Sequence, residues 1–166
     1  MTDVAVWAVH VAVYLGVALV WPPQAPGFAA AVAAALGWAS VTDWLRYEIP
    51  DAASALLVLL GAVWWALQFD EPGFEAAVAG AVLWPLAAWG VAAAYQQFRG
   101  WPGLGFGDVK LLSGIGLWAG FEATVWVVMC AALAGIGAIL LRNARSRERS
   151  LATEAIAFGP FLCLSA

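Results

Sequence analysis

Charged side chains are scarce in this sequence, and their scarcity sets the class of protein. Only 11% of the 166 residues are Asp, Glu, Lys or Arg, whereas 64% are hydrophobic. Soluble domains are nearer half apolar and a quarter charged. Several stretches of about 18 to 22 residues carry no charge, and that length crosses a hydrocarbon core roughly 30 Å thick. We therefore expect an all-α, polytopic membrane helix bundle that forms a single domain over residues 1–166.

Cysteine and histidine are almost absent as well. Cys130 and Cys163 stand singly in apolar surroundings, and the sequence contains no CxxC pair. Neither a zinc site nor a disulfide framework is therefore indicated, and we predict that both thiols are buried as small apolar groups. His10 has no second histidine with which to share a metal, so we expect a packed side chain there, with no metal and no cofactor.

The sequence also lacks the features of a nucleic-acid-binding protein and of a cleavable signal peptide. The formal net charge is −4, and no basic cluster is interleaved with aromatic residues, so no nucleic-acid partner is expected. The N-terminus has Asp3 but no basic residue before His10, and its apolar run is as long as a membrane span. We therefore predict a retained helix in place of a cleavable signal peptide.

The apolar segments predict six to seven spans, of which the last is short. The fifth, of about 13 residues, would reach only about 20 Å as a helix, so we expect it to tilt or to thin the bilayer locally. Pro85 inside the fourth should kink it or mark a carbonyl that a neighbouring helix satisfies. The segments are residues 4–21, 27–44, 52–69, 75–95, 108–120, 121–141 and 155–166.

The basic residues predict the orientation of these spans. Alternating the segments puts every basic residue on one side of the membrane, and the opposite loops carry acidic residues only. By the positive-inside rule the basic side is cytoplasmic, so we expect a multi-pass protein of the cytoplasmic (inner) membrane. The basic residues are Arg46, Arg99, Lys110, Arg142, Arg145, Arg147 and Arg149.

Two carboxyl groups fall at matching depth on this side. Asp43 ends the second segment and Asp108 opens the fifth. Two carboxyls in one partly desolvated site tend to share a proton. One can then act as general base toward a water while the other donates a hydrogen bond to a scissile carbonyl. A second interpretation stays open at this point: each Asp is a helix cap, or a partner of Arg46 or Lys110.

Three motifs follow one another along the chain. They are DxxRxxIPD from Asp43 to Asp51, GFGDVKLL from Gly105 to Leu112, and AFGPFL from Ala157 to Leu162. In this order and spacing the chain resembles the type IV prepilin peptidase family, the GxGD-type intramembrane aspartyl proteases. The resemblance covers roughly Ser40 to Leu162, nearly three quarters of the sequence. GxGD alone is a weak signal, but its combination with the two other motifs in a multi-span chain is specific.

The resemblance implies an aspartic endopeptidase that removes the basic leader of type IV pilin-like or pseudopilin precursors, just before an apolar helix in the membrane. Asp43 and Asp108 match the family's two catalytic aspartates, which act at the cytoplasmic membrane face. Gly105 and Gly107 match the glycines that shape the loop around the second aspartate. Gly159 begins a Gly-Pro pair that either offers backbone groups to an extended substrate or simply starts a helix.

Lys110 and Arg46 are predicted to support the site, and two roles stay open for them. Each lies within three residues of one of the two aspartates, so its charge would favour the ionised form of that carboxyl. Alternatively, both anchor to phospholipid headgroups, as basic residues at this depth often do.

The sequence also departs from the family pattern. It has no CxxC-bearing N-terminal region like that of the larger bacterial members, so we predict peptidase activity without methyltransferase activity. Ala157 stands where proline is common in the family, and the sequence ends early, at Ala166. The alternatives are a non-catalytic remnant of the family and a small ion-coupled transporter. A transporter would place ionisable residues near the bilayer midplane.

Overall fold

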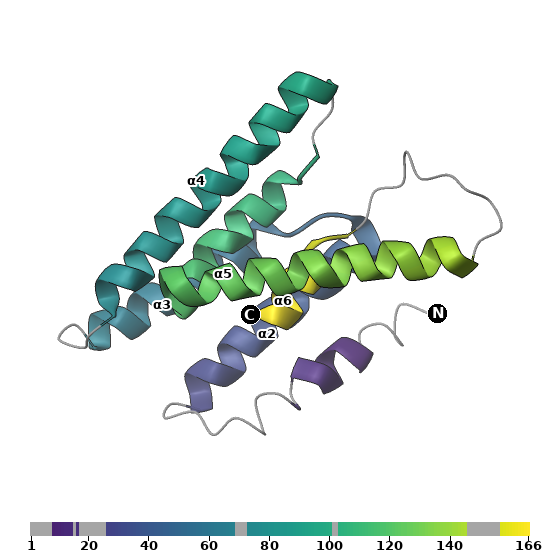
Figure 1. The fold of residues 1–166 in the computed structure, drawn as a ribbon. Helices are drawn as coiled ribbons and strands as arrows, with labels where there is room; N and C mark the ends of the chain where they lie inside the picture. Colours follow the sequence, from purple (N-terminus) through teal and green to yellow (C-terminus); the bar gives the residue numbers. More distant parts are fainter. Residues whose placement is uncertain (1–7, 15, 17–25, 69–72, 101–102, 146–156) are drawn as a thin grey trace.

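The protein is an all-α bundle, as the sequence predicts. The computed structural model describes residues 8–14, 16, 26–68, 73–100, 103–145 and 157–166, and no strand occurs within these ranges. Residues 8–14 are helical. The helices that follow, shown in Figure 1, are α2 (Pro26–Arg46), α3 (Asp51–Leu67), α4 (Phe74–Arg99), α5 (Phe106–Arg145) and α6 (Gly159–Ser165).

Three of these helices have the length and composition of membrane spans. They are α2, α4 and residues 106–141 of α5, whereas α3 is a shorter apolar helix of 17 residues. Together with the family described below, they make this a multi-pass membrane protein.

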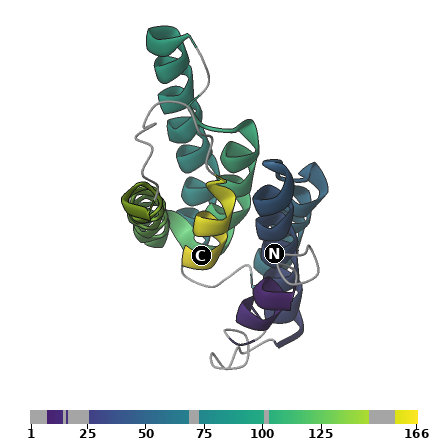
Figure 2. The ribbon, with the colours of Figure 1, turned by 90° about the vertical axis from the view of Figure 1, so that its right-hand side faces the viewer.

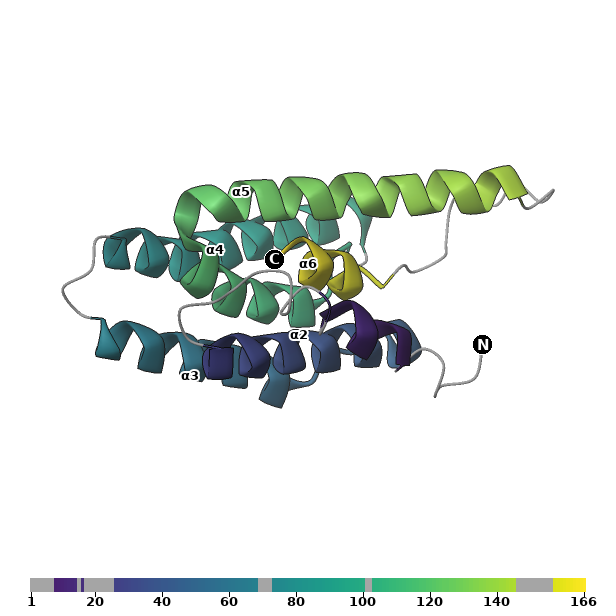
Figure 3. The same ribbon diagram turned by 90° about the horizontal axis from the view of Figure 1, so that it is seen from below.

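Helix α5 consists of two arms that meet at Gly120. Gly120 has φ 77° and ψ 173°, a backbone conformation that suits glycine because a Cβ would clash there. The two arms fold back on each other (Figure 3). Thr124 donates its hydroxyl to the Gly120 carbonyl at 2.6 Å, which satisfies one acceptor at the break. The sequence-based division between a fifth and a sixth segment at residues 120 and 121 is therefore confirmed.

Helix α4 packs on the first arm of α5 through two facing glycines. A Cβ on Gly116 would lie 2.3 Å from the carbonyl oxygen of Gly80, and a Cβ on Gly80 would lie 2.5 Å from that of Gly116. Helices in lipid associate through such close packing because no hydrophobic effect drives them together.

The hydrogen bonding of α4 is interrupted at Pro85, and α5 supplies the replacement. Because proline has no N–H, the carbonyl of Ala81 loses its donor within the helix. Ser113 donates its hydroxyl to that carbonyl at 3.2 Å. A freed carbonyl in a membrane needs such a partner, since the hydrocarbon region holds no water. The prediction that a neighbour satisfies the carbonyl freed by Pro85 is confirmed.

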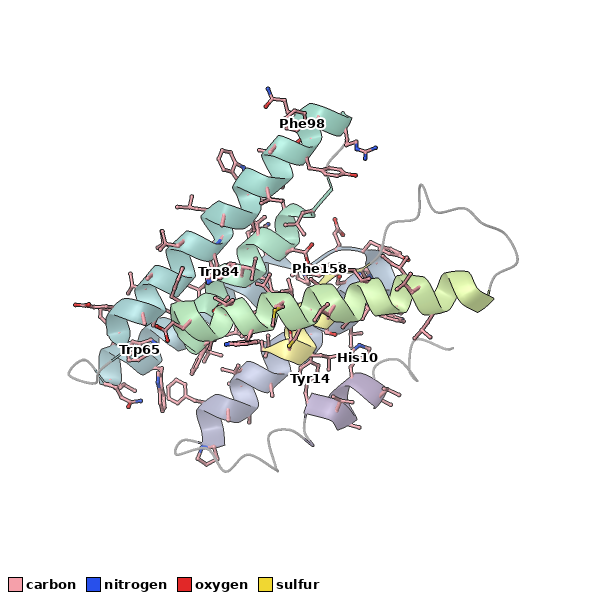
Figure 4. All side chains as sticks on the ribbon, in the orientation of Figure 1. His10, Tyr14, Trp65, Trp84, Phe98 and Phe158 are labelled. Carbon is pink, nitrogen blue, oxygen red and sulfur yellow. The ribbon has the colours of Figure 1, made fainter. Side chains whose placement is uncertain are left out.

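Indole groups tie the helices together near the Gly120 break. Each of three tryptophans donates its Nε1–H to a main-chain carbonyl at 3.0 Å: Trp65 to Leu117, Trp118 to Leu57, and Trp84 to Phe121. In Figure 4, Trp65 lies toward this end of the bundle, whereas Phe98 marks the opposite end of α4. The break is therefore held from both α3 and α4.

Only part of the first predicted span, residues 4–21, is described. Within it, Tyr14 is buried against α2, 3.4 Å from the position that a Cβ on Gly37 would take. The His10 ring lies 6.3 Å from the Trp44 ring, centroid to centroid, so it packs on α2 as expected.

Two predicted segment ends differ from the structure. Helix α4 continues to Arg99, so residues 96–99 are helical and not part of the loop. The short last segment forms a helix of only seven residues, which packs against α2 and α5 as part of the core. Most of the basic segment at 142–150 lies outside the described residues.

The prediction for the cysteines is confirmed for Cys163 and wrong for Cys130. Cys163 is buried, whereas Cys130 is exposed. Cys130 shares its helix face with Trp126 and Leu133, which are 64% and 62% exposed. That face of the second α5 arm points away from the bundle, where an apolar thiol is compatible with lipid.

Gly116→Ala is expected to destabilise the bundle by about 1–3 kcal/mol, because the new methyl group would push the α4 backbone away from α5. Thermal unfolding in detergent micelles measures the effect. Gly137→Ala is the matched control, since a Cβ at Gly137 meets nothing within 4 Å. Equal melting temperatures for the two variants would contradict the close packing.

Candidate active site

A cavity of about 1500 Å³ lies at the end of the bundle where α2 and α4 end and α3 and α5 begin. Asp43, in the last turn of α2, and Asp108, in the first turn of α5, both line it. Each side chain is only 7% exposed. The fold thus brings the two predicted catalytic carboxyls into one partly desolvated space.

The Asp43 carboxyl is held by the start of α6. The backbone N–H of Gly159 donates to Asp43 Oδ2 at 2.9 Å. A Cβ on Gly159 would lie 2.8 Å from that oxygen and 2.9 Å from Ile49 Cδ1. The close approach of amide and carboxyl therefore requires a residue without a side chain.

The Asp108 carboxyl lies against its own entry loop. A Cβ on Gly105 would be 3.1 Å from Asp108 Oδ2, and the Asp108 N–H donates to the Gly105 carbonyl at 3.1 Å. The other oxygen, Oδ1, is buried and has no hydrogen-bond partner among the described residues. Buried polar atoms are rarely left unpaired, and those at functional sites commonly await a ligand or a proton.

Ile49 brings the three motifs together. Its side chain is buried, and a Cβ on Gly107 would lie 3.0 Å from Ile49 Cβ. Since Ile49 also contacts Gly159, one apolar side chain separates the first turn of α5 from the start of α6. Gly107 and Gly159 leave the room that this side chain fills.

Lys110 forms an ion pair with Asp51, the first residue of α3. Its ammonium group also lies 5.1 Å from the centroid of the Phe106 ring. No ion pair among the described side chains joins Asp43 or Asp108 to Lys110 or Arg46. Arg46 lines the cavity. The alternative in which the two aspartates serve as ion-pair partners of these cations is therefore not supported.

The pair of Lys110 and Asp51 is largely open to solvent, with side chains 35% and 81% exposed. Such pairs contribute about 0–1 kcal/mol to stability. The pair joins the start of α5 to the start of α3. We therefore expect it to affect the relative position of these two helix ends more than the free energy of unfolding.

Sequence reasoning missed two of the residues at this site. Asp51 is one of them, and the only signal for its pair with Lys110 is that the two motifs carry opposite charges. Ile49 carried no signal beyond its place in the same motif. Of the two interpretations of Gly159, the helix start is confirmed, because α6 begins at Gly159. Neither interpretation included the hydrogen bond from the Gly159 N–H to Asp43. Within the described ranges, no group of three or more His, Cys, Asp or Glu side chains could hold a metal ion.

The fold and the site define a class: a membrane helix bundle with two buried carboxyls in one cavity at the end of its helices. Comparison with known proteins gives the family. The Type IV leader peptidase family matches residues 30–140, and the chain belongs to that family.

Curated relatives agree with this assignment. The prepilin leader peptidase/N-methyltransferase of Burkholderia pseudomallei (strain K96243) is 35% identical over 148 residues, covering 87% of this chain and 46% of the relative. That of Escherichia coli (strain K12) is 36% identical over 130 residues, covering 75% and 54%. That of Aeromonas hydrophila is 32% identical over 153 residues, covering 85% and 49%. The chain thus spans about half the length of these relatives. No solved structure matches it significantly.

Gly159→Ala is expected to destabilise the protein by about 1–3 kcal/mol, because the added methyl group would push against the Asp43 carboxyl and Ile49. Thermal unfolding in detergent micelles is the measurement. Gly137→Ala, where a Cβ meets nothing within 4 Å, is the control. Equal melting temperatures for both variants would contradict the close approach at Gly159.

Proposed function

We propose that the chain is an aspartic endopeptidase that removes the basic leader of type IV pilin-like or pseudopilin precursors, with Asp43 and Asp108 as its catalytic pair. The observation that carries the proposal is the burial of these two carboxyls in one cavity of a Type IV leader peptidase family member. The names of the relatives support the substrate class.

The proposed reaction is hydrolysis by general acid–base catalysis. One carboxylate takes a proton from a water as its oxygen attacks the scissile carbonyl carbon. The other carboxyl donates a hydrogen bond to the carbonyl oxygen, which stabilises the charge that develops there. The C–N bond then breaks, and the leaving amine takes a proton from a carboxyl. The unpaired Asp108 Oδ1 is the buried oxygen available for such a contact.

We further propose that the site faces the cytoplasm from the inner membrane. Arg46 and Lys110 line the cavity, and Arg99 ends α4 at the same end of the bundle. Glu75 and Glu122 lie at the opposite end, in the first turn of α4 and next to the Gly120 break. The positive-inside rule assigns the basic end to the cytoplasm.

Gly105, Gly107, Lys110 and Arg46 complete the proposed site. Gly105 lies in the loop that enters α5, and Gly107 lies in the first turn of that helix. Lys110 pairs with Asp51 at the start of α3, and Arg46 lines the cavity.

Asp43→Asn and Asp108→Asn are each expected to lower leader release by about 1000-fold or more, since removal of one member of a catalytic unit costs nearly as much as removal of all. Co-expression with a type IV prepilin, followed by separation of precursor and mature protein, measures the effect. Glu122→Gln, at the far end of the bundle, serves as control. Substantial processing by either Asn variant would exclude the catalytic assignment, and an inactive wild type would favour the non-catalytic alternative.

Lys110→Met and Asp51→Asn are each expected to slow processing by a similar factor of roughly three- to tenfold, and the double variant by no more than either alone, because the two residues act as one pair. The same variants should change the free energy of unfolding by less than about 1 kcal/mol. Multiplicative losses in the double variant would show that the two residues act independently, as headgroup anchoring of Lys110 requires.

A further inference from the structure

The cavity extends beyond the two carboxyls, between the second half of α4 and the second arm of α5. In each helix, lining residues recur at i, i+3, i+4 and i+7, so each helix offers one continuous face. None of the lining residues of this part is charged, and the small ones are Ala92, Ala93, Ala132 and Gly135. The others are Trp89, Tyr95 and Gln96 on α4, and Ile136 and Ile139 on α5.

Helix α6 covers part of the α5 face, because Gly135 is buried and a Cβ there would lie 3.9 Å from both Phe158 and Phe161. The α4 face is more open. The buried residues of α4, Ala77 and Gly80, both lie in its first half. Its C-terminal end projects beyond the other helices in Figures 1 and 2. Ala93 and Ile136 are exposed. We call the space between these faces the α4–α5 slot.

The slot is continuous with the part of the cavity that contains the unpaired Asp108 Oδ1. Asp108 lines the same cavity, and only 7% of the residue is exposed. Its Oδ1 has no hydrogen-bond partner among the described residues. The small residues alone would be ordinary membrane packing. Their continuity with an unpaired, buried carboxyl oxygen indicates that a ligand enters along the slot and reaches the carboxyls.

We propose that the α4–α5 slot docks one apolar membrane helix of the precursor, so that the bond to be cut falls beside Asp43 and Asp108. This inference rests on the proposed function. The walls belong to membrane-spanning helices and carry no charge, so the occupant must be apolar. Their alanines allow close helix contact in lipid. A cavity of about 1500 Å³ holds roughly two to three turns of a helix about 10 Å wide, with room left for the extended bond.

Two pairs of variants test the slot. Ala93→Trp and Ile136→Trp would fill it, whereas Ala94→Trp and Leu133→Trp add the same bulk at exposed positions outside the lining. We expect the first pair to slow processing of a type IV prepilin in membranes at least about tenfold, and the second pair to leave it unchanged.

Disulfide cross-linking gives a second measurement that does not depend on turnover. The chain carries three substitutions: Asp108→Asn, Cys130→Ala and Ala93→Cys. The prepilin carries one cysteine, placed in turn at successive positions along its apolar helix. Cross-links are expected at positions on one face of that helix, within about three turns of the cleavage site. The same background with Ala94→Cys should give none.

The outcomes separate the inference from the proposed function. One outcome is that the wild type cuts the prepilin and the slot-filling variants cut it as fast as their controls. That result would contradict docking in the slot but not the proposed peptidase function. A cross-link between two copies of this chain at Ala93, in place of the prepilin cross-link, also contradicts docking in the slot. A wild type that leaves prepilin uncut at matched expression overturns both.

Discussion

The hydrogen bond from the Gly159 amide to the Asp43 carboxyl is the contact on which the arrangement of the site depends. It joins residues 116 apart in the sequence and sets the start of α6 against the end of α2. Ile49 packs against the same glycine and against Gly107, so the first turn of α5, which carries Asp108, lies against the same contact. With the amide and the carboxyl in this position, both aspartates line one cavity.

The absence of water in a bilayer explains why the remainder of the bundle is built as it is. Every backbone group freed by an irregularity must find a partner inside the protein. Ser113 satisfies the carbonyl freed by Pro85, and indole groups from α3 and α4 bind carbonyls beside the Gly120 break. These contacts concentrate at the end of the bundle away from the carboxyls. The second half of α4 has no buried residue, and the cavity opens beside it.

Much of the fold could be predicted from the sequence because membrane spans are marked by local composition. The ends of the second and third segments fall within two residues of α2 and α3, and the break at Gly120 was placed correctly. The prediction that Cys130 is buried was wrong, because composition does not tell which face of an apolar helix meets lipid. The polar side chains among residues 96–99 mark the end of the apolar span but not the end of the helix, which continues to Arg99.

The sequence by itself determined the membrane class, the family and the end of the bundle at which the two aspartates lie. These follow from the transfer free energies of side chains and from short motifs, both of which are properties of neighbouring residues. Only the tertiary structure decided the partners: Asp51 for Lys110, the Gly159 amide for Asp43, and Ser113 for the Ala81 carbonyl. Each of these contacts depends on how closely two distant segments approach in space, and helix packing sets that distance.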